Sequence, residues 1–166
     1  MGDLMEGWHD FFVAEAGAAA ALAGLLFVAV SINLNRILEF PNLPTRVIEA
    51  LSALIAVLFV ASFALVPHQS VMMTGIEIAM TGLVLLAINI ASLRADLKHS
   101  PAMRVKSGRR VSRVLANQLP PLPFIAGGAL LAFGQAVGTA FFLPGTLLCF
   151  LSGLFSAWVL LIEIQR

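Results

Sequence analysis

The sequence predicts an all-α integral membrane protein, a bundle of five transmembrane helices, and three observations lead to this prediction. Hydrophobic residues make up 60% of the 166 positions and charged residues only 11%, whereas soluble domains are about half apolar and a quarter charged. The apolar residues form long unbroken runs, which favour helices over the alternating segments of a membrane β-barrel. The basic residues gather in a few short regions between these runs.

The apolar runs define the expected spans. A bilayer core about 30 Å thick needs roughly 20 residues of helix, and five segments meet this length, at about residues 11–34, 47–66, 71–93, 120–142 and 146–164. The last apolar stretch is too long for one span, and the motif "FFLPG" in its middle predicts a turn at Pro144 and Gly145. We therefore expect a single transmembrane domain over residues 1–166.

The distribution of lysine and arginine predicts the orientation. Of the ten basic residues, Arg36 and Arg46 flank the first loop, seven lie in a basic loop at residues 94–118, and Arg166 ends the sequence. With five spans these three regions share one side of the membrane, which the positive-inside rule assigns to the cytoplasm. The N-terminus then lies outside and the C-terminus lies in the cytoplasm.

Polar side chains share one face of the third span. At about 100° per residue they fall within an arc of about 120°, and they are Thr74, Glu77, Thr81, Asn89 and Ser92. An ionised carboxylate near the centre of a spanning helix costs about 2.5–3.5 kcal/mol, so such a residue usually faces protein or water. Glu15 in the first span falls at a depth comparable to that of Glu77. These six residues are the candidates for an ion pathway, with a paired-carboxylate site between spans one and three as one interpretation.

Close helix packing is the competing interpretation of these faces. Small residues at intervals of four, such as Ala16, Ala20 and Gly24, let helices approach closely in lipid. Serine and threonine in a span can also bond to the backbone of their own helix. Glu15 and Glu77 would then be neutral, hydrogen-bonded packing residues.

The basic loop is the candidate site for lipid or a protein partner. Its densest positive charge lies on Arg104, Lys106, Arg109, Arg110 and Arg113. Each basic residue near an anionic leaflet contributes about 1 kcal/mol, so we expect these side chains to bind anionic headgroups at the cytoplasmic face. The loop alternatively serves only to set the topology. A net charge of +1 gives no reason to expect a nucleic-acid partner.

No motif for catalysis or cofactor binding occurs in the sequence. Phosphate-binding loops, dinucleotide fingerprints, HExxH and nucleophile elbows are all missing. Cys149 is the single cysteine, and His9 and His68 on the predicted outer side have no metal-binding spacing. We therefore expect no enzymatic activity, no cofactor and no metal.

The N-terminal motif "WHDFF" and the following "GAAAALAGLLFVAVSINLNRIL" give the sequence a family resemblance. This pattern resembles that of small multi-pass bacterial membrane proteins, some of which are labelled modulators of a membrane-anchored AAA protease. The resemblance covers mainly the first 38 residues and implies a bacterial inner-membrane location. The well-known modulators have seven spans, whereas five are expected here, and no functional residue is carried over.

Together these features favour an oligomeric channel or small transporter for cations or protons. Charged or polar rings at a symmetry axis can set ion selectivity, and the polar face of the third span offers such groups. The abundance of small-residue faces suggests a homo-oligomer. The alternative is a non-transporting regulatory or scaffold protein that binds a partner protein or anionic lipid.

The exposure of position 77 to water tests the pathway interpretation. In a variant with Glu77→Cys and Cys149→Ala, we expect the new thiol to react with a membrane-impermeant thiol reagent in intact vesicles, because a pathway residue is hydrated. A second variant, with His68→Cys and Cys149→Ala, is the control. Labelling of the thiol at position 68 but not of that at position 77 would indicate that position 77 is packed against protein.

Overall fold

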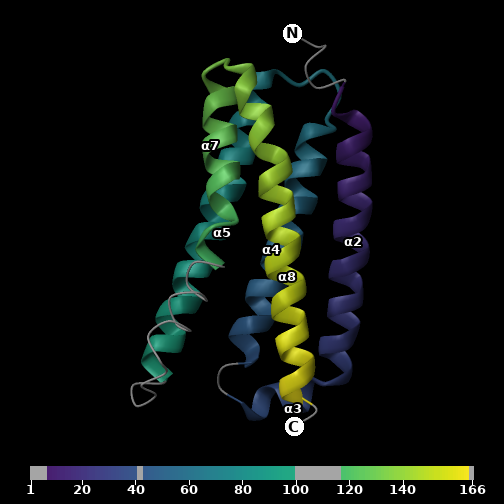
Figure 1. Cartoon of the computed structure of the whole chain (residues 1–166), viewed down its shortest axis with the longest axis vertical. Helices are drawn as coiled ribbons and strands as arrows, with labels where there is room; N and C mark the ends of the chain where they lie inside the picture. The colour runs from purple at the N-terminus through teal and green to yellow at the C-terminus, as the bar shows by residue number, and fades with distance from the viewer. Residues whose placement is uncertain (1–6, 41–42, 100–116, 165–166) are drawn as a thin grey trace.

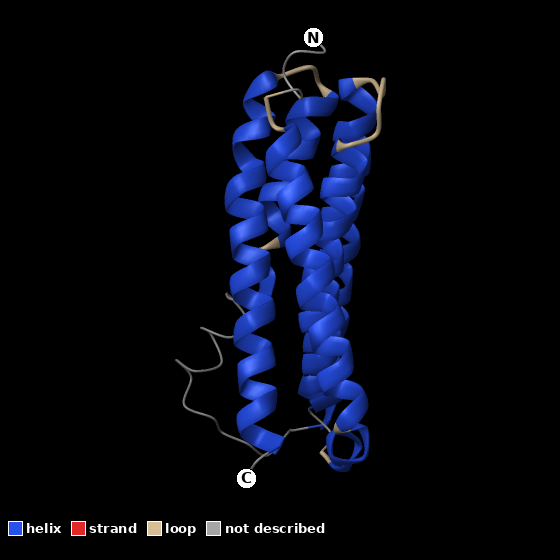
Figure 2. Cartoon of the chain, turned by 90° about the vertical axis from the view of Figure 1, so that its right-hand side faces the viewer, coloured by secondary structure: helices blue, strands red, loops and turns tan. Residues whose placement is uncertain are grey.

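The computed structural model describes residues 7–40, 43–99 and 117–164, and the regular elements in these ranges are all helices (Figures 1 and 2). In chain order they are α2 (His9–Ile32), α3 (Leu34–Glu39), α4 (Leu43–Ala64), α5 (Val71–His99), α7 (Pro121–Ala132), the 3₁₀ helix η1 (Ala136–Phe141) and α8 (Phe142–Ile164). The all-α prediction is therefore confirmed for the described part of the chain.

Four segments of the described chain are long and apolar enough to cross a membrane: α2, α4, most of α5, and η1 with α8. Helix α2 runs from the upper to the lower end of Figure 1 and α4 runs back up, whereas α5 and the segment of η1 with α8 both run downward, with α7 leading up between them. The expected set of five spans is not confirmed, because the fourth apolar segment is divided. The side of the membrane on which each end lies stays a prediction.

Helix α7 covers only the upper half of the bundle (Figure 1). It has 12 residues, about 18 Å at the rise of an α-helix, and is too short to cross a bilayer core. Gly134 ends it with a φ of +76°. The Gly134 N–H bonds to the Leu131 carbonyl at 2.8 Å and the Gln135 N–H to the Leu130 carbonyl at 2.9 Å, the two bonds of a Schellman motif.

The predicted turn at Pro144 and Gly145 is wrong, because the chain turns at Phe133–Gln135 and both residues lie in the first turn of α8. Proline suits a first turn, where its missing N–H would have no partner within the helix. Gly145 is needed for packing instead: a Cβ there would lie 2.7 Å from the ring of Phe124.

Backbone-to-backbone contact joins α7 to its neighbours. A Cβ on Gly128 would lie 2.5 Å from the Ala79 nitrogen and 2.6 Å from the Gly75 oxygen of α5. On the adjacent side of α7, a Cβ on Gly138 of η1 would lie 2.5 Å from the Gly127 oxygen. Because no side chain intervenes, α5, α7 and η1 form one closely packed unit.

Helix α4 is the centre of the remaining packing. It contacts α2, α5 and α8. In its most apolar stretch of 18 residues 50% of the residues are buried, compared with 11% in the corresponding stretch of α2. Helix α2 uses every seventh residue, Phe12, Ala19 and Leu26, as its buried contact face. The small residues Ala20 and Gly24, expected to form a packing surface, are exposed and lie outside this contact face.

The glycine contact between α5 and α7 generates a stability prediction. We expect Gly128→Ala to destabilise the fold by about 1–3 kcal/mol, because the added methyl group overlaps backbone atoms of α5 that cannot rotate away. Gly17→Ala is the matched control: nothing lies within 4 Å of its added methyl group, so helix propensity should make it neutral or stabilising by up to about 1 kcal/mol. Unfolding in mixed detergent micelles measures both. Equal stabilities would contradict the close contact.

Candidate functional site

Glu77 lies near the upper end of α5 and is held by a residue from the preceding loop. The Gln69 side-chain N–H₂ donates a hydrogen bond to the Glu77 carboxylate, with Nε2 and Oε2 2.5 Å apart. Both side chains are half-buried. The predicted candidate Glu77 is thus partnered by a neutral amide.

The other hydroxyl groups on this part of α5 bond to their own helix. Thr81 donates to the Glu77 carbonyl at 2.8 Å, and the buried Thr74 donates to the Ser70 carbonyl at 3.3 Å. Outside α5, hydroxyl groups of the described spans show the same local pattern, at Ser31, Ser52, Ser62, Thr139 and Thr146. The hydroxyl groups of Thr74 and Thr81 therefore donate to carbonyls of the preceding turn and have no free hydrogen for a ligand.

A polar junction lies halfway down the bundle, where α7 begins. The Asn89 side chain of α5 donates to the Asn117 backbone carbonyl, and the Ser152 hydroxyl of α8 donates to the Asn117 side-chain oxygen at 3.4 Å. Asn89 is 5% exposed. These contacts tie α5, α8 and the entry to α7 together at one level, which we call the polar junction (Asn89, Asn117 and Ser152).

Prolines allow α7 to begin inside the bundle. The first four residues of a helix leave their N–H groups without partners in that helix, a cost of several kcal/mol each in lipid. At the start of α7 three of these four positions are Pro120, Pro121 and Pro123, which have no N–H. The fourth, Leu122, donates its N–H to the Leu119 carbonyl at 3.2 Å. The helix start therefore leaves no unpaired backbone donor.

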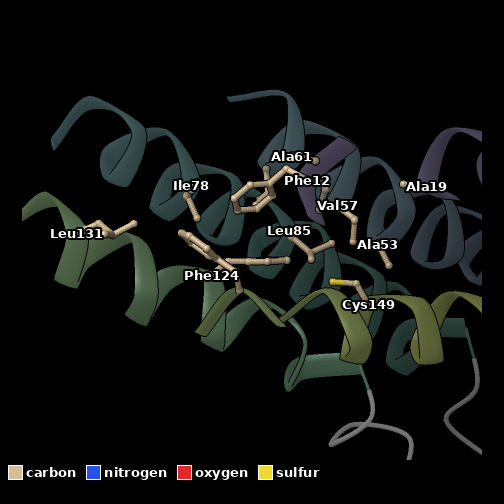
Figure 3. Packing of buried hydrophobic residues seen from close by; sticks show 13 residues of the cluster. Phe12, Ala19, Ala53, Val57, Ala61, Ile78, Leu85, Phe124, Leu131 and Cys149 are labelled. Atoms are coloured by element: carbon tan, nitrogen blue, oxygen red, sulfur yellow. The ribbon is translucent and has the colours of Figure 1, made fainter. Parts of the chain in front are cut away.

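The structure divides the predicted polar face of α5 into two sites. Glu77 lies at the upper end and Asn89 in the polar junction, twelve residues or about 120° of helix apart. Between their levels, Ile78 and Leu85 of α5 lie beside Phe124 of α7 (Figure 3), all at most 2% exposed. The fifth residue of this face, Ser92, is buried one turn below Asn89. A buried apolar layer thus separates the carboxylate from the polar junction.

Glu15 is not brought to Glu77. Helix α2 and helix α5 each pack on α4 and are not among the principal helix pairs, and α4 and α8 lie between them (Figure 1). The paired-carboxylate interpretation therefore has no support in the contacts of the described residues.

Several other predicted residues do not form a site in the described chain. Arg104, Lys106, Arg109, Arg110 and Arg113 lie outside the described residues. His9 and His68 are both exposed. In residues 7–40, 43–99 and 117–164, no three His, Cys, Asp or Glu side chains group in a way that could hold a metal ion.

No protein-family model, curated protein or solved structure matches the chain. The functional assignment therefore depends on the geometry of the two polar sites.

The polar junction generates a second stability prediction. We expect Asn89→Leu to destabilise the protein by about 1 kcal/mol, because a hydrogen bond between membrane helices contributes about 0.6 kcal/mol on average and up to about 1.7 kcal/mol. Asn33→Leu is the matched control, since the Asn33 side chain bonds only to the Ala29 carbonyl of its own helix among the described residues. A loss in Asn33→Leu as large as that in Asn89→Leu would contradict a bridging role for Asn89.

Proposed function

We propose that the chain is a membrane channel or small transporter for protons or other small cations, with its pathway along α5 and α7. The observation that carries this proposal is that α7 begins inside the bundle, at the polar junction. Helix ends at membrane depth are tolerated where they are buried in protein or line a hydrated cavity, and discontinuous helices form the binding sites of many transporters.

The two polar sites give the pathway a proposed order. Glu77 stands at the upper end, the polar junction stands halfway down, and the layer of Ile78, Leu85 and Phe124 separates them. A hydrophobic constriction of this kind can gate by excluding water. We propose that the structure corresponds to a closed state and that conduction requires α7 to move relative to α5.

Orientation, location and partners are part of the same proposal. We propose that the upper end faces outward from a bacterial inner membrane and that Arg104, Lys106, Arg109, Arg110 and Arg113 bind anionic headgroups on the cytoplasmic side. Exposed small residues on α2 support assembly as a homo-oligomer. We propose no enzymatic activity and no nucleic-acid partner.

A regulatory or scaffold protein is the second candidate. It is favoured by the hydroxyl groups that bond to their own helices, since these give the polar faces a purely structural role. The partner protein or anionic lipid would bind the basic segment.

Ion flux in proteoliposomes tests transport. We expect proton or cation flux from the wild type and at least a tenfold loss in Glu77→Gln, because the variant keeps the size of the side chain but cannot become charged (about 1.4 kcal/mol per factor of ten). Glu39→Gln, the same change at a side chain that is 61% exposed in a salt bridge to Arg36, should retain wild-type flux. Absence of flux from the wild type across pH and voltage would favour the scaffold candidate.

A further inference from the structure

The loop between α4 and α5 is shaped to place Gln69 against Glu77. His68, the residue before Gln69, has a φ of +59°, a left-handed conformation that costs a non-glycine residue free energy. The next residue, Ser70, accepts the Met73 N–H on its hydroxyl oxygen at 3.3 Å and so caps the start of α5. These two local features turn the chain so that the amide of Gln69 meets a carboxylate eight residues further along.

The elements packed around this pair bring few charged groups to it. In the sequence, no lysine or arginine occurs between Arg46 and Arg94. Residues 50–64 of α4, all of α7 and η1, and residues 142–148 of α8 contain no titratable side chain, and Glu77 is the one carboxyl group of α5 between Val71 and Leu93. The exposed His68 is the titratable group of the adjoining loop. Glu77 is therefore a carboxyl group whose immediate polar partner is neutral.

The amide of Gln69 can serve both protonation states of Glu77. Its N–H₂ group donates to the ionised carboxylate, as observed. Its oxygen, Oε1, is buried and accepts no hydrogen bond from the described residues. A half-turn of the amide about its last side-chain bond exchanges these two atoms. The oxygen would then accept the O–H of a protonated carboxyl group, so that the pair keeps a hydrogen bond in either state.

We propose that Glu77 and Gln69 form a proton-binding site at the upper end of α5. A proton from the aqueous phase binds Oε2 of Glu77 and forms an O–H bond, the amide of Gln69 turns, and its Oε1 accepts that O–H. Release reverses these steps. The proposal depends on the proposed function only in making the proton the transported cation. A hard metal ion such as Ca²⁺ needs six to eight oxygen ligands, whereas a single carboxyl group suffices for a proton.

Infrared difference spectroscopy during a pH titration tests proton binding without flux. The full chain is reconstituted in lipid nanodiscs, and the carbonyl band of protonated carboxyl groups is followed as wild type minus Glu77→Gln. We expect one titrating band in this difference, and in Glu39→Gln minus Glu77→Gln the same positive band together with a negative band from Glu39. If the same carboxyl bands disappear from the wild type and from Glu77→Gln as the pH is raised over the whole titration, the proposal is overturned.

The role of Gln69 is tested by Gln69→Leu, which removes both the donor and the acceptor. We expect the Glu77 band to shift in frequency, because its carbonyl environment loses a hydrogen bond. Gln135→Leu, at an exposed glutamine, is the matched control and should leave the band unchanged. An unchanged band in Gln69→Leu, with circular dichroism showing a folded protein, would overturn the role of the amide.

The spectra and the flux measurement separate this proposal from the proposed function. A titrating Glu77 band in a protein without flux supports the proton-binding site and contradicts the proposed transport function. Flux with no Glu77 band supports transport and overturns the proton site.

Discussion

The requirement that every backbone donor inside a membrane bundle find a partner governs this structure most strongly. Helix α7 begins halfway down the bundle, at a depth where an unpaired N–H costs several kcal/mol. Three prolines remove the N–H groups that would need partners, and Leu122 pairs with Leu119. At the other end, the Schellman motif at Gly134 pairs the carbonyls of Leu130 and Leu131. Both ends of this half-length helix are therefore stabilised by local bonds.

Since local bonds stabilise both ends of α7, contact with the neighbouring helices fixes where it lies. Lipid is as apolar as leucine, so contact between membrane helices depends on close approach and not on the hydrophobic effect. The glycines at positions 75 and 128 allow this approach, and Gly138 repeats it on the side of η1. Asn117 adds direction, because its carbonyl and its side-chain oxygen accept from two different helices. Position and depth of α7 thus depend on separate interactions.

Apolar length alone was enough to locate the long helices. The expected spans at residues 11–34, 47–66 and 71–93 correspond to α2, α4 and α5, since a bilayer-length run of apolar residues has few other stable conformations. The division of the fourth segment was missed because the turn was assigned to Pro144 and Gly145 and not to Gly134. Gly134 has the left-handed conformation that a turn requires, whereas Gly145 serves side-chain packing. Composition cannot distinguish these two uses of glycine.

Helical periodicity placed Glu77 and Asn89 on a polar face but could not supply their partners. Gln69 bonds to Glu77 from a loop, where helical periodicity does not apply, and the left-handed backbone conformation of His68 places it there. Asn89 bonds to the backbone carbonyl of Asn117. Every residue has this group, so the type of the residue at position 117 could not indicate the contact. Long-range partners of this kind follow only from the three-dimensional arrangement.

The central position of α4 has a consequence for biogenesis. Helices leave the ribosome in order, and α2, α4 and α5 can pair with their neighbours as each enters the bilayer. The face of α4 that carries Ala50 and Leu54 is different, because it receives Gly153 of α8. Helix α2 also reaches this part of α4 through Leu26. The packing of this face is therefore completed only when α8 inserts after the helices that precede it, and a bundle that lacks α8 leaves one side of it open to lipid.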